Sequence, residues 1–112
     1  MASFRMDRTS EDVKREITDI MRSLKDPRIT GLLSVVKVDL AKDLSLCRVY
    51  ISSLDGYEKA KEAVKGLESA AGYVRRELGM RMSLRRSPEI KFIADDSIEH
   101  SAEINRLLHK LK

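Results

Sequence analysis

Residues 56–82 read GYEKAKEAVKGLESAAGYVRRELGMRM, and this stretch decides the fold. Apolar residues recur through it at helical spacing, at Ala60, Ala63, Val64, Leu67, Ala71, Val74 and Leu78. Small residues interrupt the stripe around Gly72, and a glycine inside a helix costs about 1 kcal/mol relative to alanine. We therefore predict two helices, 56–70 and 72–82, which meet at a kink or a tight backbone approach formed by Ala70, Ala71 and Gly72.

Capping patterns mark two helix starts. Asp55 is followed three positions later by Glu58, which is the spacing of a capping box ahead of the first of these helices. Asp96 and Glu99 repeat the spacing near the C-terminus. They predict a last helix whose apolar face carries Ile104, Leu107, Leu108 and Leu111.

A further helix is expected before the first strand. Thr9 or Ser10 is suited to cap it. Pro27 disfavours the α conformation at the residue before it, so the helix should end near Lys25. Its apolar face would carry Val13, Ile17, Ile20, Met21 and Leu24.

The spacing of apolar residues changes from 3.6 to 2 after Gly31. Two alternating runs, joined by a polar link, predict an antiparallel hairpin with one buried face. A third strand follows Pro88. The inward residues are expected to be Val36, Val38, Leu40, Cys47, Val49, Ile51, Ile90, Phe92 and Ala94. We interpret residues 1–112 as a single α+β domain, with helices covering one face of a three-stranded sheet.

The composition excludes several classes of protein. The chain has 112 residues, of which 42% are hydrophobic, and a single cysteine, which excludes an internal disulfide framework and suits a reducing compartment. No apolar run approaches the roughly 20 residues that a membrane span requires. The first eight residues carry charges where a signal peptide needs an apolar stretch. We therefore expect a cytoplasmic protein without a membrane partner.

Catalytic and metal-binding patterns are also missing from the sequence. His100 and His109 fall in the expected last helix, nine residues apart, and do not project in the same direction. There is no cysteine pair, HExxH or glycine-rich phosphate loop. Adjacent Asp95 and Asp96 are typical of a helix cap. We expect no enzyme activity, metal, cofactor or small-molecule substrate.

Positive charge is concentrated in one segment. The net charge is +4, and residues 71–91 carry six basic and two acidic side chains, a difference of +4 that equals the whole excess. Five of the six are arginines, whose planar guanidinium suits paired contacts to phosphate. Such a segment is either a solvated surface or a site for a polyanion. Its concentration and its preference for arginine favour the polyanion.

The expected order of elements, α-β-β-α-α-β plus a C-terminal helix, resembles that of a type II KH domain. KH domains clamp a nucleic-acid backbone with a GxxG loop between two helices. This chain has Ala70-Ala71-Gly72-Tyr73 at that place, so the loop is missing. The replacement is similar to the Ala-x-Gly kink of the ribosome-binding factor A family.

The resemblance to this family extends over nearly the whole chain. Each motif alone is weak, but their order and spacing together are specific. The matching segments are Arg5-Met6-Asp7-Arg8, Asp26-Pro27-Arg28, Val36-x-Val38, Asp43-Leu44-Ser45, Arg48-Val49-Tyr50-Ile51-Ser52, Leu67-x-x-Ala70-x-Gly72-x-x-Arg75, Leu84-Arg85-x-x-Pro88-Glu89-Ile90-x-Phe92 and Asp95-x-Ser97.

The resemblance implies an RNA-binding protein of ribosome biogenesis. Members of the family associate with free 30S subunits and assist late 30S maturation and 16S rRNA processing, near the 5′-terminal helix of the RNA. They matter especially in the cold. We expect a monomer whose partners are the 30S subunit and its 16S rRNA. Two alternatives stay open: a stand-alone KH-like RNA-binding module, and a protein-interaction module whose basic face docks an acidic partner.

The expected RNA contacts come from the second helix of the kinked pair and the loop after it. They are Arg75, Arg76, Arg81, Arg85 and Arg86, with Lys91 at a strand edge and Arg5, Arg8 and Arg28 extending the surface. Arg85 has an alternative structural role, in which it pairs with Asp95. Because aromatic residues are scarce, we expect recognition of RNA shape and backbone.

Overall fold

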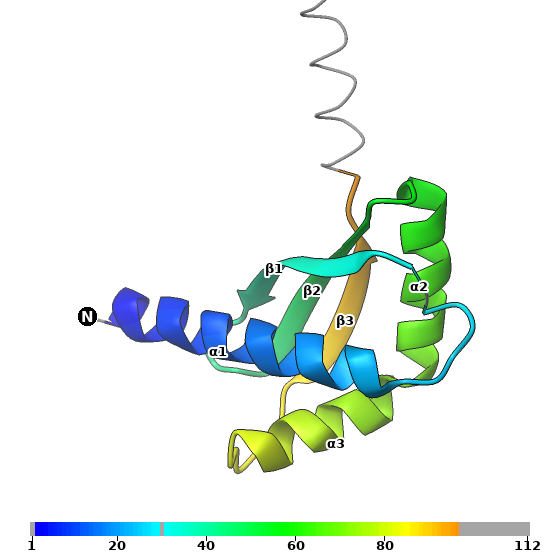
Figure 1. Ribbon diagram of the computed structural model, residues 1–112. Coiled ribbons are helices and arrows are strands. Elements are labelled where there is room, and N and C mark those ends of the chain that lie inside the picture. The colour runs from blue at the N-terminus through cyan, green and yellow to red at the C-terminus, as the bar shows by residue number, and fades with distance from the viewer. Residues whose placement is uncertain (1, 30, 97–112) are drawn as a thin grey trace, which may run out of the picture.

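The computed structural model describes residues 2–29 and 31–96, and the side chains of residues 9–29 and 31–96 (Figure 1). The expected last helix lies outside the described residues, as do the side chains of Arg5 and Arg8. The elements are α1 (Ala2–Ser23), β1 (Leu33–Leu40), β2 (Leu46–Ser53), α2 (Tyr57–Ser69), α3 (Ala71–Arg81) and β3 (Glu89–Ala94). This order confirms the α-β-β-α-α-β prediction.

The first helix is longer than expected. It begins at Ala2 instead of after a cap at Thr9 or Ser10. That expectation was wrong because a capping residue starts a helix only where the preceding residues leave the helical conformation. Residues 2–8 contain no glycine or proline and include residues that favour helices. The helix ends at Ser23, whose hydroxyl donates to the Ile20 carbonyl at 2.6 Å.

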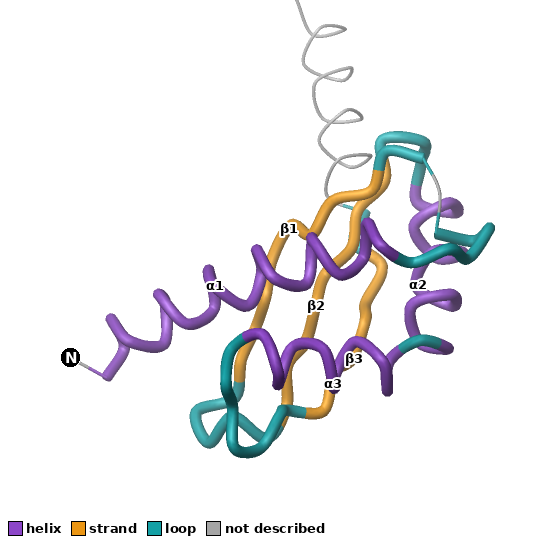
Figure 2. Tube along the Cα trace, turned by 60° about the horizontal axis from the view of Figure 1, so that its bottom comes forward, coloured by secondary structure: helices purple, strands orange, loops and turns teal. Residues whose placement is uncertain are grey.

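The sheet is mixed and has the order β1-β2-β3. β1 pairs antiparallel with β2, and β2 pairs parallel with β3 after the chain has passed through α2 and α3. Figure 2 shows α1 and α3 lying across the same face of the sheet. The helices therefore cover one face of the sheet, as predicted.

A bulge in β1 changes which valine is buried. Val35 pairs with Ile51 and Lys37 with Tyr50, so Val36 is an extra residue on this strand. The side chain of Val35 is 5% exposed, whereas Val36 is only half-buried. The expected inward position of Val36 was wrong because a simple period of 2 does not anticipate a bulge.

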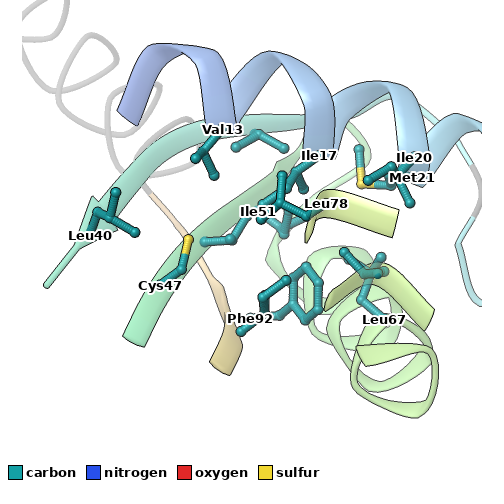
Figure 3. Packing of buried hydrophobic residues seen from close by; sticks show 14 residues of the cluster. Val13, Ile17, Ile20, Met21, Leu40, Cys47, Ile51, Leu67, Leu78 and Phe92 are labelled. Carbon is teal, nitrogen blue, oxygen red and sulfur yellow. The ribbon is translucent and has the colours of Figure 1, made fainter. Parts of the chain in front are cut away.

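One hydrophobic core joins α1, the sheet, α2 and α3 (Figure 3). Cys47 lies in it with no exposed surface. Burial, and to a smaller extent the charge of Asp39, raises the pKa of the Cys47 thiol to about 12, so the thiol stays protonated. The largest fully buried side chains include Ile17, Ile20, Ile51, Leu67 and Leu78.

The expected kink between the two helices is confirmed at Ala70. This residue has φ −98° and ψ 8°, and it ends α2 and caps α3. The close backbone approaches are at Gly66 and Gly79, away from the bend. A Cβ added at Gly66 would lie 2.9 Å from Ile29 Cγ1, and one at Gly79 would lie 3.2 Å from Ser87 Cβ. A Cβ at Gly72 would meet nothing within 4 Å.

The capping box expected at Asp55 is not formed. Gly56, with φ 113°, occupies the N-cap of α2, and no side chain caps this helix. The Asp55 carboxylate instead accepts a hydrogen bond from the Leu32 amide at 3.4 Å, next to the start of β1. The helix starts one residue later than the sequence spacing suggests, so Asp55 lies before the cap and faces the neighbouring loop.

Candidate nucleic-acid interface

The helix α3 presents most of its surface outward. Its buried residues are Val74 and Leu78, four positions apart, which form one narrow contact with the core. The side chains on either side of this contact are free to face solvent. Arg75, Arg76 and Met80 are exposed, and Met80 is 62% exposed.

Arg75 is held by the loop that leads into β3. Its Nε donates to the Ser87 carbonyl at 3.1 Å, and the Ser87 hydroxyl donates to the Arg75 carbonyl at 2.7 Å. This pair of contacts orients the guanidinium. Its two terminal nitrogens have no partner among the described residues, so they remain available to a ligand.

A shallow groove of about 460 Å³ runs between α3 and this loop. The helix contributes Gly72, Arg75, Arg76 and Gly79, with the apolar side chain of Met80. The loop contributes Leu84, Arg85 and Ser87. We call this depression the basic groove. It combines three guanidinium groups with bare helix backbone, and none of the described residues that line it is acidic.

Arg85 and Arg86 follow a tight turn at the end of α3. Ser83 has φ 52°, and the Leu84 amide donates to the Gly79 carbonyl at 2.9 Å. Both arginines are exposed. Among the side chains of residues 9–29 and 31–96, Arg85 forms no ion pair, so the alternative pairing with Asp95 is not formed there.

Arg81 forms ion pairs with two carboxylates of α1 at the protein surface. Its Nη1 lies 2.5 Å from Asp19 Oδ2 and 3.5 Å from Glu16 Oε2, and both carboxylates belong to α1. The hydrogen bond to Asp19 contributes most to raising the pKa of the guanidinium. The structure thus places Arg81 in an α1–α3 contact, apart from the basic groove.

Arg28 is also engaged by its neighbours. It donates from Nη2 to Asp26 Oδ2 at 2.8 Å and to Ser69 Oγ at 3.3 Å, which fastens the 26–28 turn to the end of α2. The side-chain hydrogen bond from Arg28 lowers the pKa of Asp26. This salt bridge compensates the charge of Arg28 within the fold.

Lys91 lies on the sheet face that points away from the helices. Its neighbours Ile90 and Phe92 are buried against the helices, and successive side chains of a strand alternate between faces. It pairs in register with Arg48.

The structure therefore brings Arg75, Arg76 and Arg85 together, with Arg86 beside them in the chain, and separates them from Lys91.

Sequence reasoning missed four residues that line the groove, Gly79, Met80, Leu84 and Ser87. The contact between Arg75 and Ser87 joins residues twelve positions apart, and no local sequence pattern predicts it. Gly79 had a signal, because a glycine inside a predicted helix often marks a close approach. Its close neighbour is Ser87.

Two other kinds of feature are missing from the described part of the chain. Within residues 2–29 and 31–96, none of the helices has the length and apolar character needed to cross a bilayer. In the same residues, no group of three or more His, Cys, Asp or Glu side chains is placed to hold a metal ion.

The three-stranded sheet, the helices on one face and the bent α2–α3 pair without GxxG define a KH-like domain with a basic groove. The family model for ribosome-binding factor A matches residues 5–108. The chain therefore belongs to the ribosome-binding factor A family.

Relatives and solved structures agree with this assignment. Ribosome-binding factor A of Acetivibrio thermocellus is 46% identical over 107 residues, which cover 95% of this chain and 87% of the relative. That of Clostridium novyi is 45% identical over 113 residues, covering 100% and 93%. The crystal structure of the factor from Thermus thermophilus has a TM-score of 0.70 at 30% identity, covering 79% of this chain and 92% of the other.

A further related structure concerns binding to the 30S subunit. It is a homology model of the Thermus thermophilus factor, fitted into a cryo-EM map of its complex with the 30S subunit. The TM-score is 0.63 at 31% identity, and the match covers 75% of this chain and 88% of the other.

Proposed function

We propose that this protein is a ribosome assembly factor that binds free 30S subunits and assists late 30S maturation and 16S rRNA processing, near the 5′-terminal helix of the RNA. The proposal takes residues 1–112 as one domain that acts as a monomer in the cytoplasm. Membership of the ribosome-binding factor A family supports it. The 30S complex of the related Thermus thermophilus factor supports the choice of subunit.

The observation that carries the proposal is the basic groove. Arg75, Arg76 and Arg85 line it, and no carboxylate among the described lining residues compensates their charge. Guanidinium groups on a fixed helix and loop suit phosphates held at fixed positions by structured RNA. Specificity would then come from the shape of the subunit surface, because the described lining of the groove has no aromatic side chain to stack on bases.

Both alternatives make different predictions for a binding experiment. A stand-alone KH module would bind short single-stranded RNA, but Ala70 and Ala71 stand where its clamping loop would need glycine and flexibility. A protein-interaction module would bind an acidic protein surface and would not need rRNA. We favour the assembly factor because the family match spans residues 5–108, beyond the kinked helix pair alone.

Sedimentation of cell lysates tests the proposal directly. The protein should travel with free 30S subunits and be absent from translating ribosomes. A strain lacking it should accumulate unprocessed 16S precursor, with the largest effect at low temperature. A protein that stays at the top of the gradient, in a deletion strain with normal 16S processing, would contradict the proposal. Purified protein with isolated 30S subunits, or with rRNA-free subunit proteins, separates the alternatives.

A further inference from the structure

One face of the sheet has none of the described helices packed on it. α1 and α3 both lie across the opposite face (Figure 2). On each strand, the side chains that alternate with the buried ones point away from these helices. We call this surface the open sheet face, and its central residues are Lys37, Asp39, Arg48, Tyr50, Lys91 and Ile93.

Two like charges are direct neighbours on the open sheet face. Arg48 of β2 and Lys91 of β3 pair in register, and both are exposed. Like charges on directly opposite positions of neighbouring strands destabilise a sheet. Asp39 compensates Arg48 only in part, because their ion pair is 3.6 Å long and the two side chains are 50% and 45% exposed. Lys91 forms no ion pair among the described side chains, so a bound anion would relieve the repulsion.

An aromatic ring lies beside these two charges. Tyr50 is half-buried and pairs in register with Lys37 on one side and with Ile93 on the other. The Lys37 ammonium lies 5.6 Å from the centroid of the Tyr50 ring, and Lys37 is exposed. A ligand from solvent can therefore reach the ring face that the ammonium now covers. Among the described residues, the Tyr50 hydroxyl forms no hydrogen bond.

We propose that the open sheet face is a second RNA-binding surface, which takes one unpaired nucleotide of single-stranded RNA. The base stacks on the ring of Tyr50, and the phosphate lies between Arg48 and Lys91. Arg48 and Tyr50 are two positions apart on one strand, which separates their Cα atoms by about 6.7 Å, a span that one nucleotide covers from phosphate to base. The Lys37 ammonium gives way to the base, because its long side chain is exposed and flexible.

A single-stranded nucleotide fits this face better than an acidic protein segment does. A carboxylate would pair with Arg48 and Lys91 but would make no use of the ring of Tyr50. Bases, by contrast, stack on aromatic side chains whatever their identity. The exposed carboxylates of Asp39 and Glu89 lie on the same face, so the positive charge is confined to its centre and suits one phosphate.

This inference goes beyond the proposed function, which concerns structured RNA bound in the basic groove. The groove belongs to α3 and the loop after it, and α3 lies across the other face of the sheet. The two surfaces would let one domain hold structured RNA on one side and a single-stranded segment on the other.

Titration with oligoadenylate tests the inference. The background protein has Arg75, Arg76 and Arg85 all changed to Gln, which removes the basic groove as a competing site. Tyr50→Ala should weaken binding about tenfold, because the stacking of one base is lost, whereas Tyr50→Phe should stay within about twofold, because the ring is kept. Tyr57→Ala is the matched control and should change nothing. Tyr57 is also half-buried and also has a lysine ammonium near its ring, at 5.1 Å, but it lies on α2.

Two further measurements test the geometry of the site. Lys91→Gln should reduce the slope of log affinity against log salt by about 0.7, the change for one phosphate contact to a single strand. The ring protons of Tyr50 should shift upfield in NMR spectra when oligoadenylate binds, because a stacked base shields them. Circular dichroism checks that each variant folds.

The possible results separate stacking from its competitors. Unchanged affinity in both Tyr50→Ala and Lys91→Gln would overturn the inference, and so would an equal loss in Tyr50→Phe and Tyr50→Ala. If Tyr50→Ala does not fold, the NMR shift in the background protein decides. Polyglutamate that binds Tyr50→Ala and the background protein equally well, and displaces oligoadenylate, would assign the face to an acidic protein instead. A wild-type protein that fails to bind 30S subunits would overturn the proposed function alone, since these titrations use no subunit.

Discussion

The helices α2 and α3 follow each other in the chain and pack on the same core, yet their surfaces differ. α2 carries three lysines and three glutamates, and two of its pairs are closed, Lys61–Glu58 at 2.9 Å and Lys59–Glu62 at 3.6 Å. α3 carries three arginines and one glutamate. That glutamate, Glu77, accepts a hydrogen bond from the Tyr73 hydroxyl at 3.2 Å.

This difference teaches that charge balance, rather than charge content, separates a solvated surface from a binding surface. On α2, four of the six charges pair with one another across single helical turns, which is typical of an exposed helix face. On α3 the charges of Arg75 and Arg76 are not compensated among the described residues. A polyanion is the partner that would compensate them.

The largest expected effect tests whether the buried faces of α2 and α3 contribute equally to stability. Leu67 of α2 and Leu78 of α3 both have no exposed surface. Replacing either with alanine should lower the free energy of unfolding by about 2–5 kcal/mol, because each change removes buried methyl groups and leaves a cavity. Urea unfolding measures it. A loss well under 1 kcal/mol at one site only would mean that this helix is poorly docked.

Charge reversal on α3 should weaken binding to 30S subunits far more than charge reversal on α2. The variant with Arg75, Arg76 and Arg85 all changed to Glu should bind 30S subunits about 100-fold more weakly or worse, because it loses phosphate contacts and gains repulsion. The matched control changes Lys59, Lys61 and Lys65 to Glu and should lose less than about threefold. Co-sedimentation gives the affinities, and circular dichroism checks that both variants fold. Equal losses in both would refute the assignment of the binding face.

A single substitution sharpens the comparison through salt dependence. Affinity for 30S subunits should fall steeply as salt rises, because binding releases counterions from the RNA. Arg76→Gln should reduce the slope of log affinity against log salt by about 1, the change for one lost phosphate contact. Lys61→Gln on α2 should leave the slope unchanged. Titrations at several salt concentrations measure both, and an unaltered slope in the arginine variant would exclude Arg76 from the interface.

The smallest effect is expected at Arg81, which lies on α3 but does not line the groove. Arg81→Gln should lower the thermal midpoint by no more than about 3 °C, because its partner Asp19 is 68% exposed and surface ion pairs contribute little. Affinity for 30S subunits should fall less than in Arg76→Gln. Asp19→Asn should reproduce the small change in melting. A large loss of binding in Arg81→Gln alone would return this residue to the interface.

Local patterns in the sequence were sufficient for the order of the described elements and for the kink, but not for the start of α1 at Ala2. The predicted helices 56–70 and 72–82 differ by about a residue at each end from Tyr57–Ser69 and Ala71–Arg81. Apolar spacing decides such helices, because each buried side chain recurs once per turn. The bulge at Val36 and the cap at Gly56 could not be predicted, since both depend on how distant segments meet.

The candidate site could be predicted only in part, for the same reason. The basic segment was visible in the sequence, and Arg75, Arg76 and Arg85 of that segment line one groove. The sequence did not indicate that α1 would supply carboxylates to Arg81, because Asp19 and Arg81 are 62 positions apart. The number of basic residues in a segment therefore overestimates its binding surface, because some of them pair with carboxylates elsewhere in the fold.

The parallel pairing of β2 with β3 also has a consequence for how the chain folds during synthesis. The hairpin of β1 and β2 needs only the link 41–45 to close, so it can form early. β3 joins only after α2 and α3 have been made, and until then β2 remains an edge strand with unpaired backbone groups. The last described strand thus completes the sheet, and a nascent chain that has not reached Ala94 lacks the finished domain.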